Sequence, residues 1–126
     1  MQLRRAFGEK EKSNRTYSRK SLEKIIPKIK DYIKKFNTYP FSYVHIIDAI
    51  IFGSFAEGFE KCRDLDVAFV LERKKGRKLD LWSSGSTCAI HEDMRNISAR
   101  IDPYFTDDPD YFVRAKMSHI SINNWD

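Results

Sequence analysis

The sequence predicts a small α/β or α+β protein with a single mixed sheet flanked by helices. Two observations lead to this fold class. Apolar runs of strand length recur at 43–52, 65–71 and 96–105, and a segment with helical apolar spacing precedes them. With 126 residues, of which 41% are hydrophobic and 33% charged, the chain suits one folded domain.

The first half of the chain gives a helix, a strand and a turn. Residues 21–36 repeat Leu and Ile at helical spacing, and Pro27 either kinks this helix or marks a late start near residue 26. Residues 43–52 are apolar and predict a buried strand, followed by a turn at 53–58 that we expect to open a short helix.

The second half adds two strands and ends in a helix. The apolar run 65–71 predicts a strand, and the charged residues 72–78 predict a loop. Residues 87–95 have helical character, and 96–105 predict a third strand. Asp-Asp-Pro at 107–109 is typical of a helix start, so we expect a last helix that reaches Ile120.

Positive charge is concentrated near the N-terminus. Residues 1–40 hold 12 Lys or Arg and 4 Asp or Glu, although the net charge of the whole chain is only +5. We therefore expect residues 1–20 to be a basic arm outside the catalytic core, and 21–126 to form the domain. The basic block could bind nucleic acid, a nucleotide or an acidic partner, or it could be a solvated surface.

Cysteine and hydropathy patterns exclude several classes of protein. Cys62 and Cys88 form neither a zinc pattern nor a disulfide framework, which favours a reducing, cytoplasmic environment. No apolar run reaches the roughly 18 residues that a membrane span requires, and the N-terminus lacks the apolar core of a signal peptide.

The segment between residues 50 and 71 carries the chemical signal. An apolar strand runs directly into Gly53 and Ser54, which allow a tight turn and offer a hydroxyl and an amide to a phosphate. Asp64 and Asp66 follow in the second strand, two residues apart, and therefore project from the same face. Paired carboxylates repel each other unless a cation such as Mg²⁺ lies between them.

A third carboxylate would complete a site for two metal ions. Asp102 is the best candidate because it lies in the third predicted strand, which we expect beside the strand of Asp64 and Asp66. Its carboxylate should then lie within about 5 Å of theirs, close enough to share cations. Asp48 and Asp80 are the alternatives.

These motifs resemble the signature of the DNA polymerase beta-type nucleotidyltransferase superfamily, in particular its minimal nucleotidyltransferase (MNT) branch. The resemblance covers roughly residues 45–120. It rests on Phe52-Gly53-Ser54, on Ala56 and Gly58, on Asp64-Leu65-Asp66-Val67, and on the later Ile101-Asp102 and Pro109-Asp110.

The resemblance implies a nucleotidyltransferase-like fold and a nucleotidyltransferase activity. Asp64, Asp66 and Asp102 would hold two Mg²⁺ ions, or Mn²⁺, and Gly53 and Ser54 would bind the phosphates of ATP or another nucleoside triphosphate. A nucleoside monophosphate, AMP in the simplest case, would pass to a hydroxyl acceptor. The MNT branch further suggests an antitoxin that modifies a HEPN-type toxin.

Three positions depart from the family pattern. Phe55 and Glu57 stand where members often carry Arg, and Arg63 stands before the first Asp, where members often carry Ser. Lys61 and Arg63 are the cations that could compensate for the two missing arginines. This departure favours an alternative hypothesis, in which the fold persists with weak or absent catalysis and the protein neutralises or scaffolds a protein partner. A nucleic-acid-binding adaptor is a third hypothesis, which depends only on the basic N-terminal segment.

Overall fold

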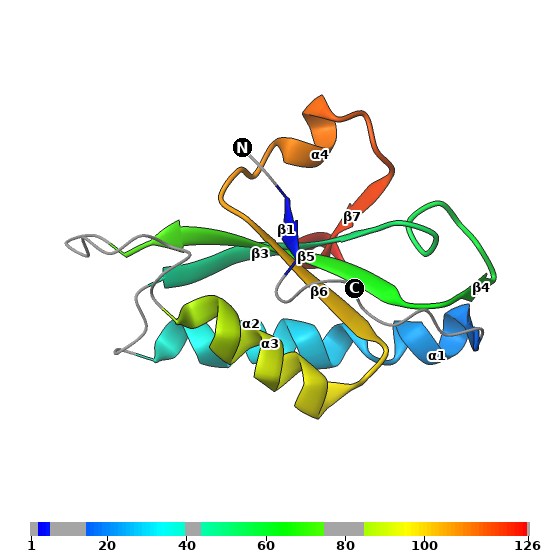
Figure 1. The fold of residues 1–126 in the computed structure, drawn as a ribbon, viewed down its shortest axis with the longest axis horizontal. Coiled ribbons are helices and arrows are strands. Elements are labelled where there is room, and N and C mark those ends of the chain that lie inside the picture. The colour runs from blue at the N-terminus through cyan, green and yellow to red at the C-terminus, as the bar shows by residue number, and fades with distance from the viewer. Residues whose placement is uncertain (1–2, 6–14, 40–43, 75–84, 126) are drawn as a thin grey trace.

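The computed structural model describes residues 3–5, 15–39, 44–74 and 85–125, and these residues build a mixed sheet with helices on both faces (Figure 1). The sheet has five strands in the order β1 (Arg4–Arg5), β6 (Ile101–Thr106), β5 (Leu65–Arg73), β3 (Val44–Phe52) and β7 (His119–Ser121). β5 and β6 are parallel, and the other neighbouring pairs are antiparallel. The predicted mixed sheet with flanking helices is confirmed.

A second sheet, which the sequence analysis did not predict, has two strands. β2 (Tyr17–Ser18) pairs antiparallel with β4 (Lys61–Cys62). Both β1 and β2 belong to the basic arm defined from the sequence as residues 1–20, so two segments of that arm take part in sheets.

The N-terminal helical region consists of two helices, α1 (Arg19–Glu23) and α2 (Ile26–Thr38). Pro27 lies in the first turn of α2, where its missing N–H costs no intrahelical hydrogen bond. Of the two readings of Pro27, the late start near Ile26 is therefore correct. α3 (Ser86–Ile97) follows Gly85, which has a left-handed backbone at φ 81°.

The core lies on both faces of the sheet. Figure 1 shows α1, α2 and α3 on one side and α4 (Tyr111–Arg114) on the other. Alternate strand residues follow this division: Ile51, Val67 and Phe69 pack in the larger cluster with α2 and α3, whereas Ala68 and Val70 pack with Phe112 of α4. Burial on both faces explains why these strands are continuous apolar runs.

Four predicted boundaries were wrong. Residues 53–58 form a turn and do not begin a helix. The third strand starts at Ile101, because α3 extends to Ile97, and the second strand continues to Arg73.

The predicted last helix is the fourth error, because it is only the four residues of α4. Lys116 adopts a left-handed backbone at φ 56°, which ends the helical region. The chain then turns into β7 and the short 3₁₀ helix η1 (Ile122–Asn124).

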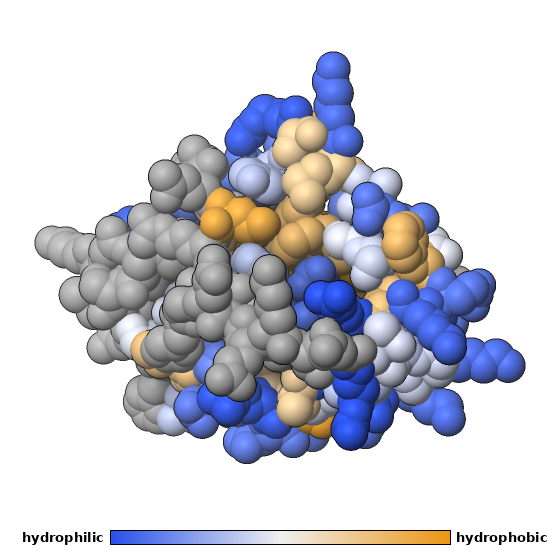
Figure 2. All heavy atoms as spheres, turned by 45° about the vertical axis from the view of Figure 1, so that its right-hand side comes forward, coloured by the Kyte–Doolittle hydropathy of each residue, from blue (hydrophilic) through white to orange (hydrophobic). Residues whose placement is uncertain are grey.

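One face of the molecule combines hydrophilic and hydrophobic side chains. Figure 2 shows hydrophilic side chains around a smaller group of hydrophobic ones on one face of the molecule. None of the helices within the described residues is long and apolar enough to cross a membrane.

Candidate active site

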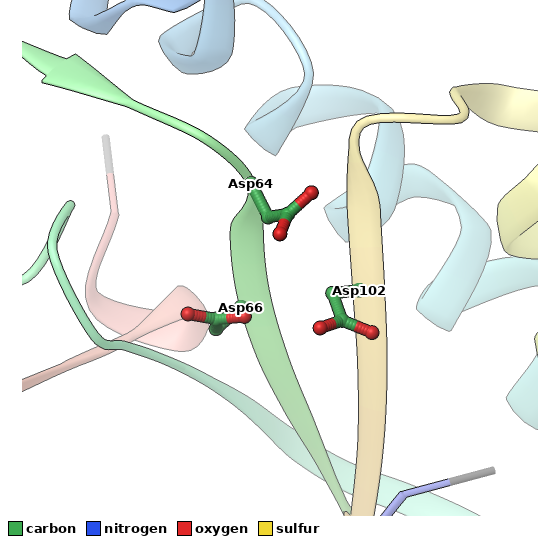
Figure 3. A group of neighbouring side chains, drawn as sticks. All are labelled: Asp64, Asp66 and Asp102. Atoms are coloured by element: carbon green, nitrogen blue, oxygen red, sulfur yellow. The ribbon is translucent and has the colours of Figure 1, made fainter. Parts of the chain in front are cut away.

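Asp64, Asp66 and Asp102 lie together at one end of the β5–β6 pair (Figure 3). One carboxylate oxygen from each residue lies within 4.8 Å of the others. The expectation that the Asp102 carboxylate lies within about 5 Å of the pair is confirmed. Asp102 is buried, at 5% exposure, whereas Asp64 and Asp66 are half-buried.

Strand register produces this arrangement. Asp66 and Asp102 are direct partners in the parallel β5–β6 ladder, so their side chains project from the same face of the sheet. The Leu65 N–H donates a hydrogen bond of 2.9 Å to the Arg100 carbonyl, which joins the starts of the two strands. Asp64 immediately precedes β5 and reaches the same point from its end.

Gly53 follows β3 and lies against Asp66. Its φ is 74°, a backbone conformation that glycine adopts without steric cost. A Cβ atom at this position would overlap with Oδ2 of Asp66 and lie 3.4 Å from its Cγ. The glycine therefore serves two needs, the left-handed turn and the close approach of a site carboxylate.

The 53–58 turn is closed by its own backbone. The Glu57 N–H donates to the Gly53 carbonyl, the Gly58 N–H to Phe55, and the Phe59 N–H to Ser54, each at 3.1 Å. The amides of residues 54–56 come before the first of these donors. Amides at the start of a turn are suited to bind an anion, and here they lie next to the residue that contacts Asp66.

Tyr104 donates to the buried carboxylate of Asp102, and a histidine of α3 is influenced by the charge of that carboxylate. The Tyr104 hydroxyl, on the same strand face, donates a hydrogen bond of 3.3 Å to Oδ2 of Asp102. Burial, followed by the charge of Arg95, lowers the pKa of the His91 imidazole, while the charges of Glu92 and then Asp102 raise it by less.

The three carboxylates fit a hard divalent cation. Carboxylate oxygens are the ligands that Mg²⁺ and Mn²⁺ prefer. Oxygens on one cation at 2.0–2.6 Å lie at most about 5 Å apart, which agrees with the 4.8 Å span of this cluster. Asp64, Asp66 and Asp102 would be the ligands.

The other predicted site residues have different outcomes. Lys61 and Arg63 are exposed, the first in β4 and the second beside Asp64, and neither forms an ion pair with a described residue. Asp48 instead joins the β7 region to β3, because its carboxylate accepts hydrogen bonds from the Ser121 hydroxyl and from the Asn123 N–H. Asp80 lies outside the described residues.

The sequence analysis missed Arg19 and Tyr17, which contact the surroundings of the site from the N-terminal segment. Arg19 donates to the carbonyl of Phe55 in the turn, and Tyr17 lies under the guanidinium of Arg100. Their only signal in the sequence was the basic character of this segment, which does not identify individual partners.

Comparisons with known protein families, with curated proteins and with solved structures found no match to this chain.

Proposed function

We propose that this protein is a divalent-metal-dependent nucleotidyltransferase. The proposal is carried by one observation: one oxygen from each of three carboxylates, two on neighbouring strands and one just before β5, lies within 4.8 Å of the others, beside a glycine turn that contacts one of the residues. A cation site and an anion-binding turn in direct contact suit a substrate such as ATP, whose phosphates need both. The similarity to the MNT motifs supports the same activity.

Each part of the site has a role in the proposed reaction. The amides at the start of the 53–58 turn and the Ser54 hydroxyl bind the outgoing phosphates. An acceptor hydroxyl gives its proton to Asp102, and its oxygen bonds to the α-phosphorus as the bond from that phosphorus to the pyrophosphate oxygen breaks. Bound Mg²⁺ or Mn²⁺ would supply stabilisation of the charge on the attacking and leaving oxygens.

The acceptor that we propose is a hydroxyl on a HEPN-type protein, with AMP as the transferred group. This part of the proposal depends on the resemblance to the MNT branch and on no contact in the structure. It is tested by incubating the protein with labelled ATP, Mg²⁺ and candidate HEPN proteins, and by searching the products for a protein-linked nucleotide.

A thermal-shift titration with Mg²⁺, Mn²⁺ and ATP tests the site itself. A ligand at 100 times its dissociation constant stabilises the folded state by about 2.7 kcal/mol, so saturating metal and nucleotide should raise the midpoint clearly. Asp66→Asn removes one charge from the site and should abolish this shift. Asp31→Asn removes the same charge from the exposed face of α2 and should preserve it.

The titration separates the two main hypotheses. A wild-type protein that shows no shift at millimolar ATP and Mg²⁺ would end the enzyme proposal. A shift without transfer to any acceptor would mean that the site binds its substrate and that the acceptor is missing from the assay.

A non-catalytic binding module is the second candidate, and the turn favours it in one respect. The side chain of Phe55 is fully buried and packs against Trp125, while Glu57 is exposed and acidic. These two turn residues therefore bring no positive charge to a triphosphate. Under this hypothesis the protein would bind its partner equally well with or without nucleotide and after Asp66→Asn.

A further inference from the structure

Arg19, the first residue of α1, contacts the 53–58 turn through the carbonyl and the ring of Phe55. Its Nη1 donates hydrogen bonds to the carbonyls of Phe55 at 2.7 Å and of Phe59 at 3.4 Å. Its guanidinium carbon also lies 3.9 Å from the centre of the Phe55 ring. One half-buried side chain therefore binds the backbone of the turn and covers the aromatic ring beneath it.

The backbone of Ser18 and Arg19 pairs with the residues that follow the 53–58 turn. The Arg19 N–H donates to the Glu60 carbonyl at 2.8 Å, and Ser18 pairs with Lys61 in the β2–β4 ladder. Phe55 and residues 59–61 are thus held by a short N-terminal segment. We call residues 17–19 the strap.

Tyr17 extends the strap to the residues that precede β5 and β6. It pairs with Cys62, two residues before Asp64. Its ring lies 4.2 Å from the guanidinium carbon of Arg100, which is two residues before Asp102. The strap therefore contacts the chain just before each of these two aspartates, as well as the turn beside the third.

The chemistry of Arg19 is specific to a guanidinium. Its planar group can donate to two carbonyls while it stacks on an aromatic ring, which a lysine ammonium cannot reproduce. The carbonyl of Phe55 belongs to a residue with no exposed surface, and it accepts from the Gly58 N–H as well as from Arg19. Losing the guanidinium would remove the shorter and charge-assisted of these two hydrogen bonds. Removing the guanidinium should therefore loosen the turn and not merely change the surface charge.

We propose that Arg19 is a positioning residue for nucleotide binding, which acts through the 53–58 turn. This inference rests on the proposed function, because the turn is where the phosphates would bind. Arg19 lies on the side of the turn formed by its carbonyls and does not touch the reacting atoms. It sets the conformation in which the amides of residues 54–56 meet the phosphates.

If Arg19 acts only through the turn, its substitution should lower the affinity for nucleotide and leave the affinity for metal unchanged. The carboxylates of Asp66 and Asp102 are fixed by their pairing within the β5–β6 ladder, which Arg19 does not contact. A loosened turn should therefore weaken the binding of ATP while the protein still binds Mn²⁺. Merely structural damage would weaken both, together with the thermal midpoint.

The experiment compares wild type with Arg19→Met, Arg19→Lys and Lys20→Met. Lys20 is the exposed neighbour on α1, so its substitution removes the same charge without touching the turn. Hydrogen exchange is measured at the amides of residues 57–59, whose hydrogen bonds close the turn. Dissociation constants are measured for Mn²⁺ alone and for a non-hydrolysable ATP analogue in the presence of Mn²⁺.

For Arg19→Met we expect exchange at these three amides and the nucleotide dissociation constant to rise roughly tenfold, the factor that follows the loss of one charge-assisted hydrogen bond. The Mn²⁺ dissociation constant should stay within about twofold, which corresponds to a negligible change in binding free energy. Arg19→Lys should fall between wild type and Arg19→Met, and Lys20→Met should match wild type.

Two results would overturn the inference. Unchanged exchange at residues 57–59 in both Arg19 variants would show that the guanidinium does not order the turn. Faster exchange with an unchanged nucleotide dissociation constant would show that the order of the turn does not matter for binding. If wild type binds no nucleotide, the proposed function fails, and the exchange comparison still decides whether Arg19 orders the turn.

Discussion

Replacing Gly53 by alanine should destabilise the protein through two separate effects, which the structure identifies. The new Cβ would sit on a backbone at φ 74° and would overlap with Oδ2 of Asp66. The first effect strains the turn, and the second pushes a site carboxylate away from its partners.

The two costs have different sizes. A left-handed backbone costs a residue other than glycine about 1–2 kcal/mol. Forcing an extra carbon into an occupied space adds about 1–3 kcal/mol. Gly53→Ala should therefore lower the free energy of unfolding by roughly 2–5 kcal/mol, which for a chain of 126 residues lowers the thermal midpoint by roughly 8–20 °C.

Gly58→Ala is the matched control. Gly58 belongs to the same turn and has φ 93°, but a Cβ there would meet no atom within 4 Å. It should show the backbone cost alone, about 1–2 kcal/mol. The difference between the two variants, measured by urea unfolding, isolates the overlap with Asp66.

Metal affinity provides the second measurement. Gly53→Ala should weaken Mn²⁺ binding on the order of tenfold, a typical loss when the support of a metal ligand is disturbed. Gly58→Ala should leave it unchanged. Equal destabilisation by the two variants, or equal Mn²⁺ affinity, would refute the reasoning that Gly53 is required by its contact with Asp66.

Three further predictions concern neighbouring polar groups. Asp48→Ala should cost about 1–3 kcal/mol, because it leaves donors of the β7 region without an acceptor, and Mn²⁺ affinity should not change. Tyr104→Phe should cost only about 0.5–1.5 kcal/mol and should weaken Mn²⁺ binding, because it removes the donor to Asp102. The Arg114 guanidinium holds the pKa of Asp108 below its usual 3.8; the resulting stability is present above that pH and is lost as pH falls through the lower, folded-state pKa. Unfolding measured against pH in acid should therefore show a shallower slope in Arg114→Met than in wild type.

The sequence predicted the parts of the site that depend on strand pattern. The apolar runs around Asp66 and Asp102 are long enough to identify two buried strands. Side-chain alternation predicted one face for Asp64 and Asp66, and the expected neighbouring strands predicted that Asp102 lies close to them. Their exact register was not predictable, because pairing between β5 and β6 depends on contacts across the sheet. The structure supplied the Asp66–Asp102 pairing.

The parts that the sequence did not predict are short or depend on tertiary contacts. β7 has only three residues, too few for a polar and apolar alternation to indicate a strand, and it follows the left-handed residue Lys116 and pairs with β3. Lysine is not a residue typical of that left-handed position, so no local signal marked the end of the helix. The partners of Arg19 lie 36 and 40 residues away, beyond the range of any local pattern.

The contacts of Phe55 also constrain the order in which the protein can fold during synthesis. Its ring is covered by Arg19 from one side and lies 6.1 Å from the ring of Trp125, whose carbonyl is tied to Lys30 of α2 by a 2.7 Å hydrogen bond. Arg19, which is synthesised before the turn, and Trp125, which is synthesised after it, must therefore both reach Phe55. Strands β3 and β5 can pair on the ribosome before residue 125 emerges, but the floor of the proposed nucleotide site cannot be complete. In a nascent chain, β3 and β5 could thus pair before the residues that complete the surroundings of Phe55 are available.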